Sequence, residues 1–384
     1  MTDPKILVGD CLEQMAHIES QSVQTCVTSP PYWGLRDYGT ASWEGGDDEC
    51  AHEGKFIVMK LGIGARSPKQ RSNKGSLLVS AGDCKCGAVR VDNQIGLEET
   101  HNEYVAKMVK VFAEVRRVLK DDGTLWLNLG DSYASSGKGR NGDGTSNVDP
   151  DSKQATSAGT TMGILPPSMP DGLKPKDLIG IPWRVAFALQ ADGWYLRQDI
   201  IWAKPNPMPE SVKDRCTKSH EYLFLLSKSP KYYFDSESMR EKGVMSKGDS
   251  AGSVQQNTTK THGVGGGNSG LNLAKEKLNA ELNEKGFTTR NKRDVWTINV
   301  KPFKGAHFAT MPESLVEPCV LAGSREGDIV FDPFLGSGTV AVVAERHRRN
   351  WIGCELNPDY AAIAEARITS AQPEQSLFET GVTK

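Results

Sequence analysis

One segment near the C-terminal end constrains the fold of this chain more than any other. The apolar run Ile329–Phe331 is followed by a turn with two glycines, Asp332-Pro333-Phe334-Leu335-Gly336-Ser337-Gly338, and Thr339–Arg346 has the composition of a helix. A second apolar run, Trp351–Cys354, ends at the acid Glu355. A strand, a glycine turn, a helix and a second strand are the unit of doubly wound α/β folds. The sequence therefore predicts an α/β fold with a parallel sheet.

The glycine turn predicts a ligand site at the end of the first of these strands. Gly336 and Gly338 let the backbone approach a ligand closely, and the N-terminus of the next helix favours negative charge such as a carboxylate. A phosphate-binding P-loop is disfavoured, because no Gly-Lys-Ser/Thr follows. Glu355 lies where dinucleotide-binding folds carry their ribose-binding acid. The segment alone favours S-adenosylmethionine (SAM), with a nicotinamide dinucleotide left open.

A second motif lies near the opposite end of the chain. The run Val23–Thr28 predicts a strand, and Ser29-Pro30-Pro31-Tyr32 follows at its C-terminal end. Ligands of open α/β sheets bind at the carboxyl ends of strands. Ser-Pro-Pro-Tyr is a common turn on its own, but its place after a strand and its pairing with the glycine turn make it a candidate catalytic loop.

The two motifs and their order resemble the beta group of SAM-dependent DNA methyltransferases that modify an exocyclic amino group. In that group the catalytic loop precedes the cofactor loop. The resemblance implies a Rossmann-like SAM-dependent methyltransferase fold in circularly permuted order, with two polar insertions. It extends over most of the chain outside these insertions, through Trp33–Tyr38, Arg116–Leu119, Trp126–Asp131, Ile201–Asn206 and His220-Glu221.

The resemblance also implies which residues bind SAM. The glycine turn would surround the methionine portion, and Glu355 would bind the ribose hydroxyls. Gly9-Asp10-Cys11 resembles the segment that contacts adenine, and His307–Pro312 resembles the segment that closes over the cofactor. The expected cofactor-binding residues are Asp10, Cys11, His307, Phe308, Thr310, Asp332, Phe334, Gly336, Ser337, Gly338, Thr339 and Glu355.

The candidate catalytic residues are Ser29, Pro30, Pro31 and Tyr32. An exocyclic amine of a base is a poor nucleophile, because its lone pair is delocalised into the ring. The Ser29 hydroxyl oxygen and the Pro30 carbonyl can accept hydrogen bonds from both N–H groups and restore density to the nitrogen. Tyr32 would stack on the base after it leaves the duplex. Carbon-5 methylation of cytosine is disfavoured, because it needs a cysteine that this loop lacks.

The first residue of the catalytic loop bears on which base is modified. By the resemblance, Ser29 favours the N4 of cytosine, and the N6 of adenine is the alternative with the same mechanism. A catalytically inactive DNA-binding homologue is a further alternative, against which the intact motifs argue. A methyltransferase of RNA or protein is less favoured, because two polar insertions suit a DNA duplex better than a protein tail.

The polar insertions divide the chain. Residues 38–94, rich in Gly, Ser, Lys and Cys, are expected to contact DNA, and residues 239–294 are expected to recognise the target sequence. The polar stretch 135–171 is expected to be a mobile loop. The discontinuous catalytic and SAM-binding domain then comprises residues 1–37, 95–238 and 295–384.

The net charge of the chain does not indicate a DNA-binding protein, but two local basic stretches do support DNA as a partner. The formal net charge is -2, but residues 54–82 contain no acid and six basic residues. A second basic stretch lies at residues 290–304. Such segments suit phosphate contacts, although solvated loops can have the same composition. The expected partner is double-stranded DNA, and the resemblance allows a homodimer and a cognate restriction endonuclease. Without a long apolar run or a secretory signal, we expect a soluble cytoplasmic protein.

Four residues of the first insertion form a candidate metal site. Cys50-x-His52 and Cys84-x-Cys86 offer ligands that suit a tetrahedral structural zinc ion. Both spacings are tighter than those of common zinc pairs, so four loop residues without metal are the alternative. We expect the eight cysteines to be reduced, because their scattered positions do not indicate a disulfide framework.

Overall fold

The computed structural model describes residues 5–34, 40, 42–47, 49–50, 54–59, 77–84, 86–91, 94–98, 100–134, 172–246, 284, 287–300 and 310–371. The chain divides into two compact units. Unit 1 comprises Met1–Tyr233 and Val295–Lys384, and unit 2 comprises Phe234–Asp294. The expected mobile loop at 135–171 lies outside the described residues.

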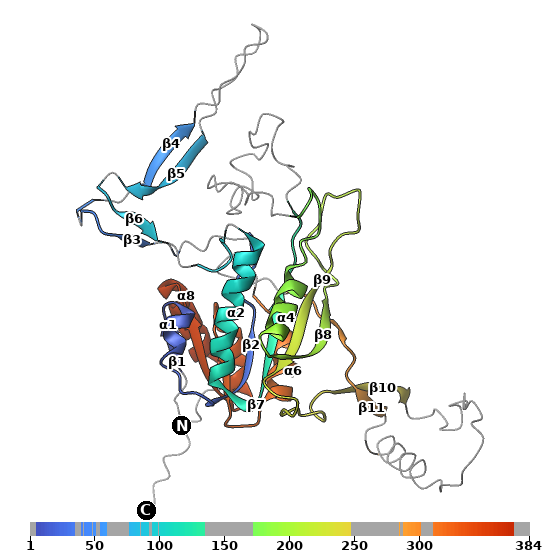
Figure 1. Ribbon diagram of the computed structural model, residues 1–384. Coiled ribbons are helices and arrows are strands. Elements are labelled where there is room, and N and C mark those ends of the chain that lie inside the picture. Colours follow the sequence, from blue (N-terminus) through green and yellow to red (C-terminus); the bar gives the residue numbers. More distant parts are fainter. Residues whose placement is uncertain are drawn as a thin grey trace, which may run out of the picture. The chain divides into compact units, whose positions relative to one another are not determined.

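Unit 1 is built on an eight-stranded sheet (Figure 1). From β1 to β7 all neighbouring strands are parallel, whereas β9 is antiparallel to both β7 and β8, and β12 is parallel to β8. The predicted α/β fold with a mostly parallel sheet is confirmed. In spatial order the strands are β1 (Lys5–Val8), β14 (Asn350–Glu355), β13 (Ile329–Asp332), β2 (Val23–Thr28), β7 (Leu119–Leu129), β9 (His220–Ser227), β8 (Tyr195–Ala203) and β12 (Val295–Thr297).

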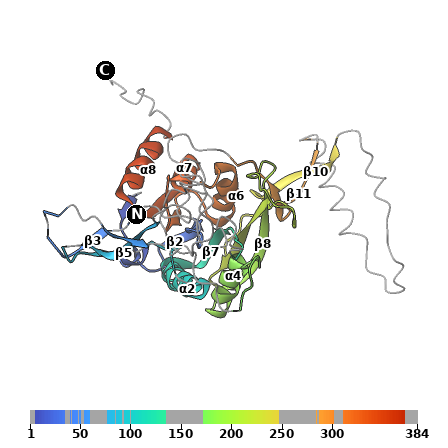
Figure 2. The ribbon, with the colours of Figure 1, turned by 90° about the horizontal axis from the view of Figure 1, so that it is seen from above.

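Helices cover both faces of this sheet, as Figures 1 and 2 show. One layer consists of α1 (Cys11–Met15), α2 (His101–Val118) and α4 (Ile181–Ala191), and the other of α6 (Glu313–Gly323), α7 (Thr339–Arg346) and α8 (Pro358–Ala371). The sequence explains α2 directly. Thr100 and Glu103 form a capping box at its start. Its apolar side chains recur at helical spacing and are buried, namely Tyr104, Met108, Val111, Phe112, Val115 and Val118.

The permuted order brings the two motifs together. Strand β13, which leads into the glycine turn, pairs in parallel with β2, which leads into Ser29. Every residue of β2 is buried. Because parallel strands end at the same edge of a sheet, segments from opposite ends of the chain meet there. Thr28 and Asp332, 304 residues apart in sequence, are joined by a hydrogen bond of 2.6 Å.

Both polar insertions contain small antiparallel sheets. Within residues 38–94 the order is β3 (Ser42–Glu44), β6 (Val89–Val91), β5 (Leu77–Cys84) and β4 (Gly54–Met59). Unit 2 contains the pair β10 (Arg240–Ser246) and β11 (Phe287–Asn291). Sequence composition indicated insertions here but not these strands. Among the described residues, no helix is both long enough and apolar enough to cross a membrane.

Candidate active site

The loops after β2, β13 and β14, together with the start of α1, surround one open pocket. Its volume is about 990 Å³ when the open mouth is included. The pocket joins the predicted catalytic loop to the predicted cofactor loop. The predicted residues that line it are Asp10, Cys11, Ser29, Pro31, Thr310, Asp332, Phe334, Gly336, Ser337, Thr339 and Glu355.

Some predicted residues do not line this pocket. Gly338 has a φ of +77°, and a Cβ atom there would lie 3.2 Å from Ala364 and Ile368 of α8, so it shapes the turn from behind. Pro30 and Tyr32 are also outside the lining. His307 and Phe308 lie outside the described residues. Sequence reasoning did not identify several lining residues, because no motif marks Thr40, Gln94, Ile95, Leu356 or Tyr360.

Asp332 is buried at the end of β13, with 2% of its surface exposed. Its Oδ1 accepts hydrogen bonds from the Thr28 hydroxyl at 2.6 Å and from the Phe334 N–H at 3.0 Å. Burial nevertheless raises the pKa of this carboxyl to about 7, because the two donors only partly replace water. At neutral pH Asp332 therefore takes up or releases a proton readily.

Glu355 clamps the glycine turn to the end of β14. Its Oε2 accepts from the Gly336 N–H at 2.8 Å, and its Oε1 accepts from the Asn357 N–H at 2.9 Å. Gly336 has a φ of +53°, a left-handed conformation that glycine adopts without strain. Burial raises the pKa of Glu355. Each carboxylate oxygen has further lone pairs, so Glu355 can still accept hydrogen bonds from a ligand.

Two further side chains fix the pocket wall. Asp10 caps α1, since its Oδ1 accepts from the Leu12 N–H at 2.8 Å. Arg367 of α8 donates to the Ser337 carbonyl at 3.1 Å, to the Ser337 hydroxyl at 3.0 Å and to the Thr339 hydroxyl at 2.9 Å. Arg367 also pairs with Glu313 of α6. Sequence reasoning missed Arg367, whose only signal is a basic residue in an alanine-rich helix.

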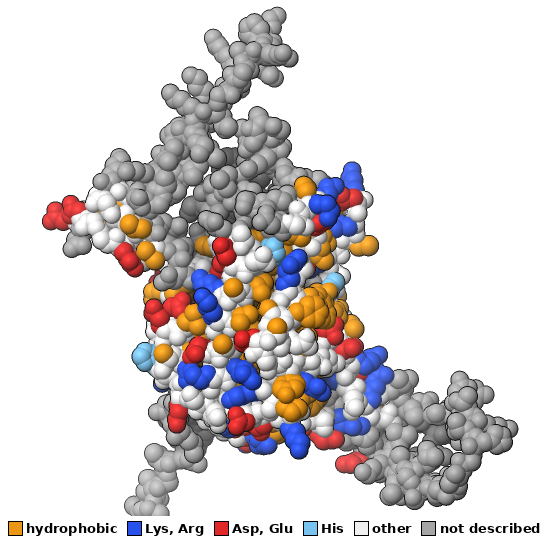
Figure 3. Space-filling view, viewed as in Figure 1, with side chains coloured by type: hydrophobic (Ala, Val, Ile, Leu, Met, Phe, Trp, Pro, Cys, Tyr) orange, Lys and Arg blue, Asp and Glu red, His pale blue; other side chains and the backbone are white. Residues whose placement is uncertain are grey.

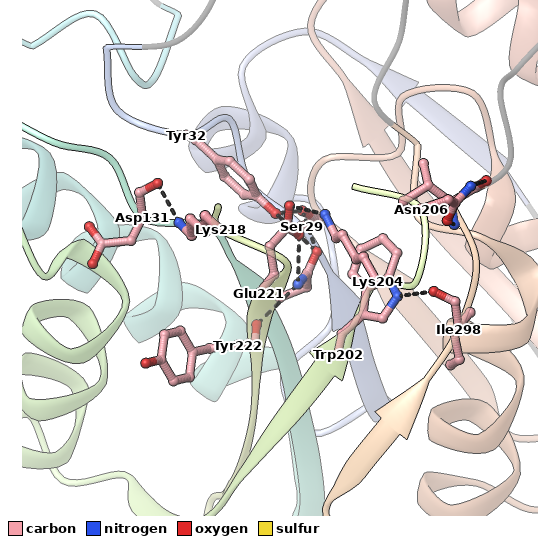
Figure 4. Close-up of polar contacts among 12 residues, drawn as sticks. Ser29, Tyr32, Asp131, Trp202, Lys204, Asn206, Lys218, Glu221, Tyr222 and Ile298 are labelled. Carbon is pink, nitrogen blue, oxygen red and sulfur yellow. Dashed lines mark hydrogen bonds and ion pairs between the residues drawn. The ribbon is translucent and has the colours of Figure 1, made fainter. Parts of the chain in front are cut away.

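Four polar side chains connect behind the catalytic loop (Figure 4). The Ser29 Oγ lies 3.2 Å from the Asn128 Oδ1 and 3.3 Å from the Tyr32 Oη. The Tyr32 Oη lies 2.9 Å from the Glu221 Oε2 and 3.0 Å from the Asn128 Oδ1. Asn128 is buried in β7, and its Nδ2 donates to the Tyr222 carbonyl at 3.0 Å. Glu221 forms an ion pair with Lys204. The catalytic loop is thus linked to β7, β8 and β9.

The packing of the Tyr32 ring and a hydrogen bond to the Pro31 carbonyl also hold the loop. A Cβ atom at Gly130 would lie 2.5 Å from the Tyr32 Cε2, so only glycine leaves room for this ring. The Pro31 carbonyl accepts from the Tyr104 hydroxyl at 2.9 Å. Burial, and then the charge of Glu221, raise the pKa of Tyr32 well above its usual value. Tyr32 is therefore a neutral phenol with one proton to donate.

Two lysines lie beyond this network in Figure 4. The Lys204 ammonium is 4.1 Å from the centre of the Trp202 ring, a cation–π contact. Lys218 donates to the Asp131 carbonyl at 2.6 Å, and burial lowers its pKa. The resemblance marked the segment that contains Lys204, whereas nothing in the sequence singled out Lys218.

The predicted metal ligands are only partly described. The Sγ atoms of Cys50, Cys84 and Cys86 lie within 4.8 Å of one another. His52, the fourth predicted ligand, lies outside the described residues. None of the eight cysteines is in a disulfide, as expected.

Comparison with known proteins agrees with this geometry. A family model described as DNA methylase matches residues 23–366. The type II methyltransferase M.Cfr9I of Citrobacter freundii is 42% identical over 360 residues, which cover 94% of this chain and 86% of the relative. M.SmaI of Serratia marcescens is 42% identical over 95% of this chain and 90% of its own length.

The fold is found in solved structures as well. The PvuII DNA methyltransferase, named as cytosine-N4-specific, superposes with a TM-score of 0.51 at 17% identity, over 97% of this chain and 92% of that one. This likeness concerns the fold alone. The family model and the two relatives cover nearly the whole chain, including both motifs. The chain therefore belongs to the DNA methylase family, which the order of its two motifs had indicated.

Proposed function

We propose that this DNA methyltransferase transfers the methyl group of SAM to the exocyclic N4 of a cytosine that is flipped out of duplex DNA. That the chain is a SAM-dependent DNA methyltransferase follows from its family. The modified base, the flipping and the role of each residue are the proposed parts. When bound, SAM supplies the electrophilic methyl group.

The residues of the pocket fit SAM. The ligand carries an amino-acid portion, a ribose and an adenine, so its site needs an anionic group, a hydroxyl acceptor and apolar walls. Asp332 supplies a buried carboxyl, and Glu355 supplies acceptor lone pairs at the strand end. Phe334, Ile95 and Leu356 supply apolar surface. We assign the methionine portion to the glycine turn, the ribose to Glu355 and the adenine to the segment at Asp10 and Cys11.

The observation that carries the proposal is that Ser29 lines the same pocket while its hydroxyl is hydrogen-bonded behind the loop. A hydroxyl activates an amine only as an acceptor, so its own proton must point away from the base. Glu221, paired with Lys204, is an acceptor for the Tyr32 proton. The Asn128 Oδ1 then accepts the Ser29 proton, and the Ser29 lone pairs are left for the base.

The second acceptor is the Pro30 carbonyl. The carbonyl of Pro31 is already engaged by Tyr104. Two acceptors oriented by the loop would take hydrogen bonds from the two N–H groups of the amine and increase the electron density on its nitrogen. Transfer is direct, without a covalent enzyme–base intermediate, because no cysteine occupies the loop.

Adenine N6 is the alternative, since the same two acceptors suit any exocyclic amine. The base can be identified by expressing the protein in a bacterial host without DNA methylation and analysing the genomic nucleosides by mass spectrometry. N4-methylcytosine is the expected product. N6-methyladenine would be consistent with the proposed mechanism but would contradict the proposed cytosine specificity. Neither product, with SAM still bound by the purified protein, would indicate an RNA or protein substrate, and loss of SAM binding would favour an inactive DNA-binding homologue.

The variant Ser29→Ala tests whether Ser29 acts on the base and not on SAM binding. Removing the hydroxyl eliminates one acceptor for the amine but no group assigned to SAM. We expect methyl transfer to be abolished and the SAM dissociation constant to change by less than about twofold. Calorimetry with SAM and a tritium-transfer assay on the same preparation measure both. A parallel loss of SAM affinity would contradict the assignment of Ser29 to the base.

We also propose duplex DNA in the cytoplasm as the substrate, with residues 239–294 as the target-recognition segment and residues 38–94 as a DNA-contacting segment. The basic composition around residues 54–82 supports the second assignment. A homodimer and a cognate restriction endonuclease, which the resemblance allows, stay predictions.

A further inference from the structure

Three cysteines of the first insertion gather at one point. Cys50 follows the turn after β3, whereas Cys84 ends β5 and Cys86 lies in the turn before β6. Their Sγ atoms all lie within 4.8 Å of one another, and those of Cys50 and Cys84 are 3.6 Å apart. Cys84 is buried, and the other two are half-buried. Thiols 34 residues apart in sequence thus converge without a disulfide.

The spacing of these sulfurs fits one tetrahedral ion. Two thiolates bound at about 2.3 Å to the same zinc ion lie about 3.8 Å apart. The observed 3.6 Å between Cys50 and Cys84 is close to this value and far from the S–S bond length of about 2.0 Å in a disulfide. A 4Fe–4S cluster fits less well, because each cysteine would bind a different iron and the sulfurs would be spread further apart.

The backbone around the sulfurs is built for this convergence. The Cys84 N–H donates to the Ala88 carbonyl at 2.7 Å, and the Gly87 N–H donates to the Cys84 carbonyl at 3.0 Å, which closes a tight turn. Gly87 has a φ of +91°. A Cβ atom at Gly46 would lie 2.7 Å from the Cys86 Sγ, which is too close for any other residue. Glycine therefore allows the turn after β3 to approach Cys86.

We propose that Cys50, Cys84 and Cys86 bind a structural zinc ion that fixes the base of the β4–β5 hairpin. The first insertion is rich in Gly, Ser and Lys, and a metal site can contribute stability to such a segment. Thr40 and Gln94, which lie at the two ends of the insertion, line the pocket. The ion would therefore fix the ends of β4 and β5, which the basic sequence of residues 60–76 connects. The DNA-contacting role of this segment rests on the proposed function, whereas the metal site does not.

Metal analysis of the full chain tests the site. The protein is purified without a polyhistidine tag, from medium with added zinc, and its metal content is measured by plasma mass spectrometry. We expect roughly one zinc per chain in the wild type and less than about 0.1 in Cys84→Ser/Cys86→Ser. Cys216→Ser is the matched control, because Cys216 is exposed and outside the cluster, and it should retain zinc. Cobalt substitution should give a thiolate charge-transfer absorption that the double variant loses.

The outcomes separate the metal site from the proposed function. Wild-type protein that binds SAM but contains no zinc would overturn the site, as would a Cys50–Cys84 disulfide found by mass spectrometry of the unreduced protein. A double variant that keeps its zinc would also overturn it. If the site is correct, the double variant should keep SAM affinity within about twofold and bind duplex DNA at least about tenfold more weakly. If the zinc-loaded protein methylates adenine, the proposed cytosine specificity is wrong, but the proposed metal site is still supported.

Discussion

Ser29 differs from a carboxylate at the same position, because a hydroxyl can donate a hydrogen bond as well as accept one. The direction of its proton depends on Tyr32, Glu221 and Asn128. Tyr32 has one proton and two acceptors, Glu221 at 2.9 Å and Asn128 at 3.0 Å. A carboxylate is the stronger acceptor. Glu221 therefore takes the Tyr32 proton and leaves Asn128 for Ser29.

Replacing Glu221 should disturb this assignment of the Tyr32 and Ser29 protons to their acceptors. In Glu221→Gln the side-chain amide can donate to Tyr32, whose proton then competes with that of Ser29 for Asn128. We expect kcat to fall about tenfold, which corresponds to about 1.4 kcal/mol, while SAM affinity is unchanged. Single-turnover transfer and calorimetry measure the two quantities.

A double-mutant cycle separates this role from the ion pair with Lys204. Tyr32→Phe removes the intermediary hydroxyl, so in that background Glu221→Gln should reduce kcat by much less than tenfold. An equal reduction in both backgrounds would show that Glu221 acts on catalysis by a different route.

Asp332 should give SAM binding a pH dependence. Its folded-state pKa of about 7 is above the usual 3.8, so at a pH slightly below neutral most molecules carry the proton. A cationic ligand favours the ionised carboxylate. SAM binding at about pH 6.5 should therefore release protons, and SAM affinity should rise as the pH approaches and passes 7. Calorimetry in buffers of different ionisation enthalpy detects the release. Asp332→Asn should abolish it, and an unchanged release in that variant would rule out Asp332 as its source.

At the scale of elements, helix α8 holds the cofactor loop. Arg367 reaches from α8 to three oxygens of Ser337 and Thr339 and to Glu313 on α6. Two helices and the glycine turn are thereby joined through one guanidinium, whose planar group can donate in several directions.

Arg367→Ala should loosen the turn. Loss of these donors should weaken SAM binding about tenfold, with a smaller effect on kcat at saturating SAM. Arg367→Lys is the control, since it retains the charge near Glu313 but cannot reproduce the fork of donors. It should give an intermediate dissociation constant for SAM. If SAM binds Arg367→Ala as tightly as wild type, α8 does not support the cofactor loop.

The elements that the sequence predicted were those with regular apolar patterns. The strand Val23–Thr28 is found as expected, because a short run of this kind before a Pro-Pro turn is typical of a strand that is buried throughout. The short strands β3 and β6 were not predicted. Three residues carry too little pattern, and such strands form only when a partner strand completes their hydrogen bonds.

At the scale of the whole molecule, charge and the division into two units bear on how DNA is bound. Basic and acidic side chains are interspersed on the face shown in Figure 3, which agrees with a net charge of -2. Unit 2 is held by its own contacts, since β10 pairs with β11 and Glu241 forms ion pairs with Arg290 and Arg293. Every residue that lines the pocket belongs to unit 1.

Target recognition should therefore be separable from cofactor binding. In a variant with residues 247–283 replaced by a two-residue hairpin turn, SAM affinity should stay within about twofold. Methylation of the cognate site should fall by at least about tenfold, because base-edge contacts supply specificity. Sequencing of methylated sites and calorimetry measure the two effects. Undiminished methylation at the same sites would exclude the segment from recognition.

The sequence by itself determined the fold class and located the two motifs that we propose bind SAM and the base, since these depend on local patterns of apolar residues, glycines and a strand-end acid. Only the tertiary structure decided which side chains support them. Asn128 contacts Ser29, Glu221 contacts Tyr32 and Arg367 contacts Thr339 across 28 or more residues of the chain, and no local pattern encodes such contacts. Likewise, the pairs Cys50-x-His52 and Cys84-x-Cys86 predicted a metal site, but only the pairing of strands brought three thiols within reach of one ion.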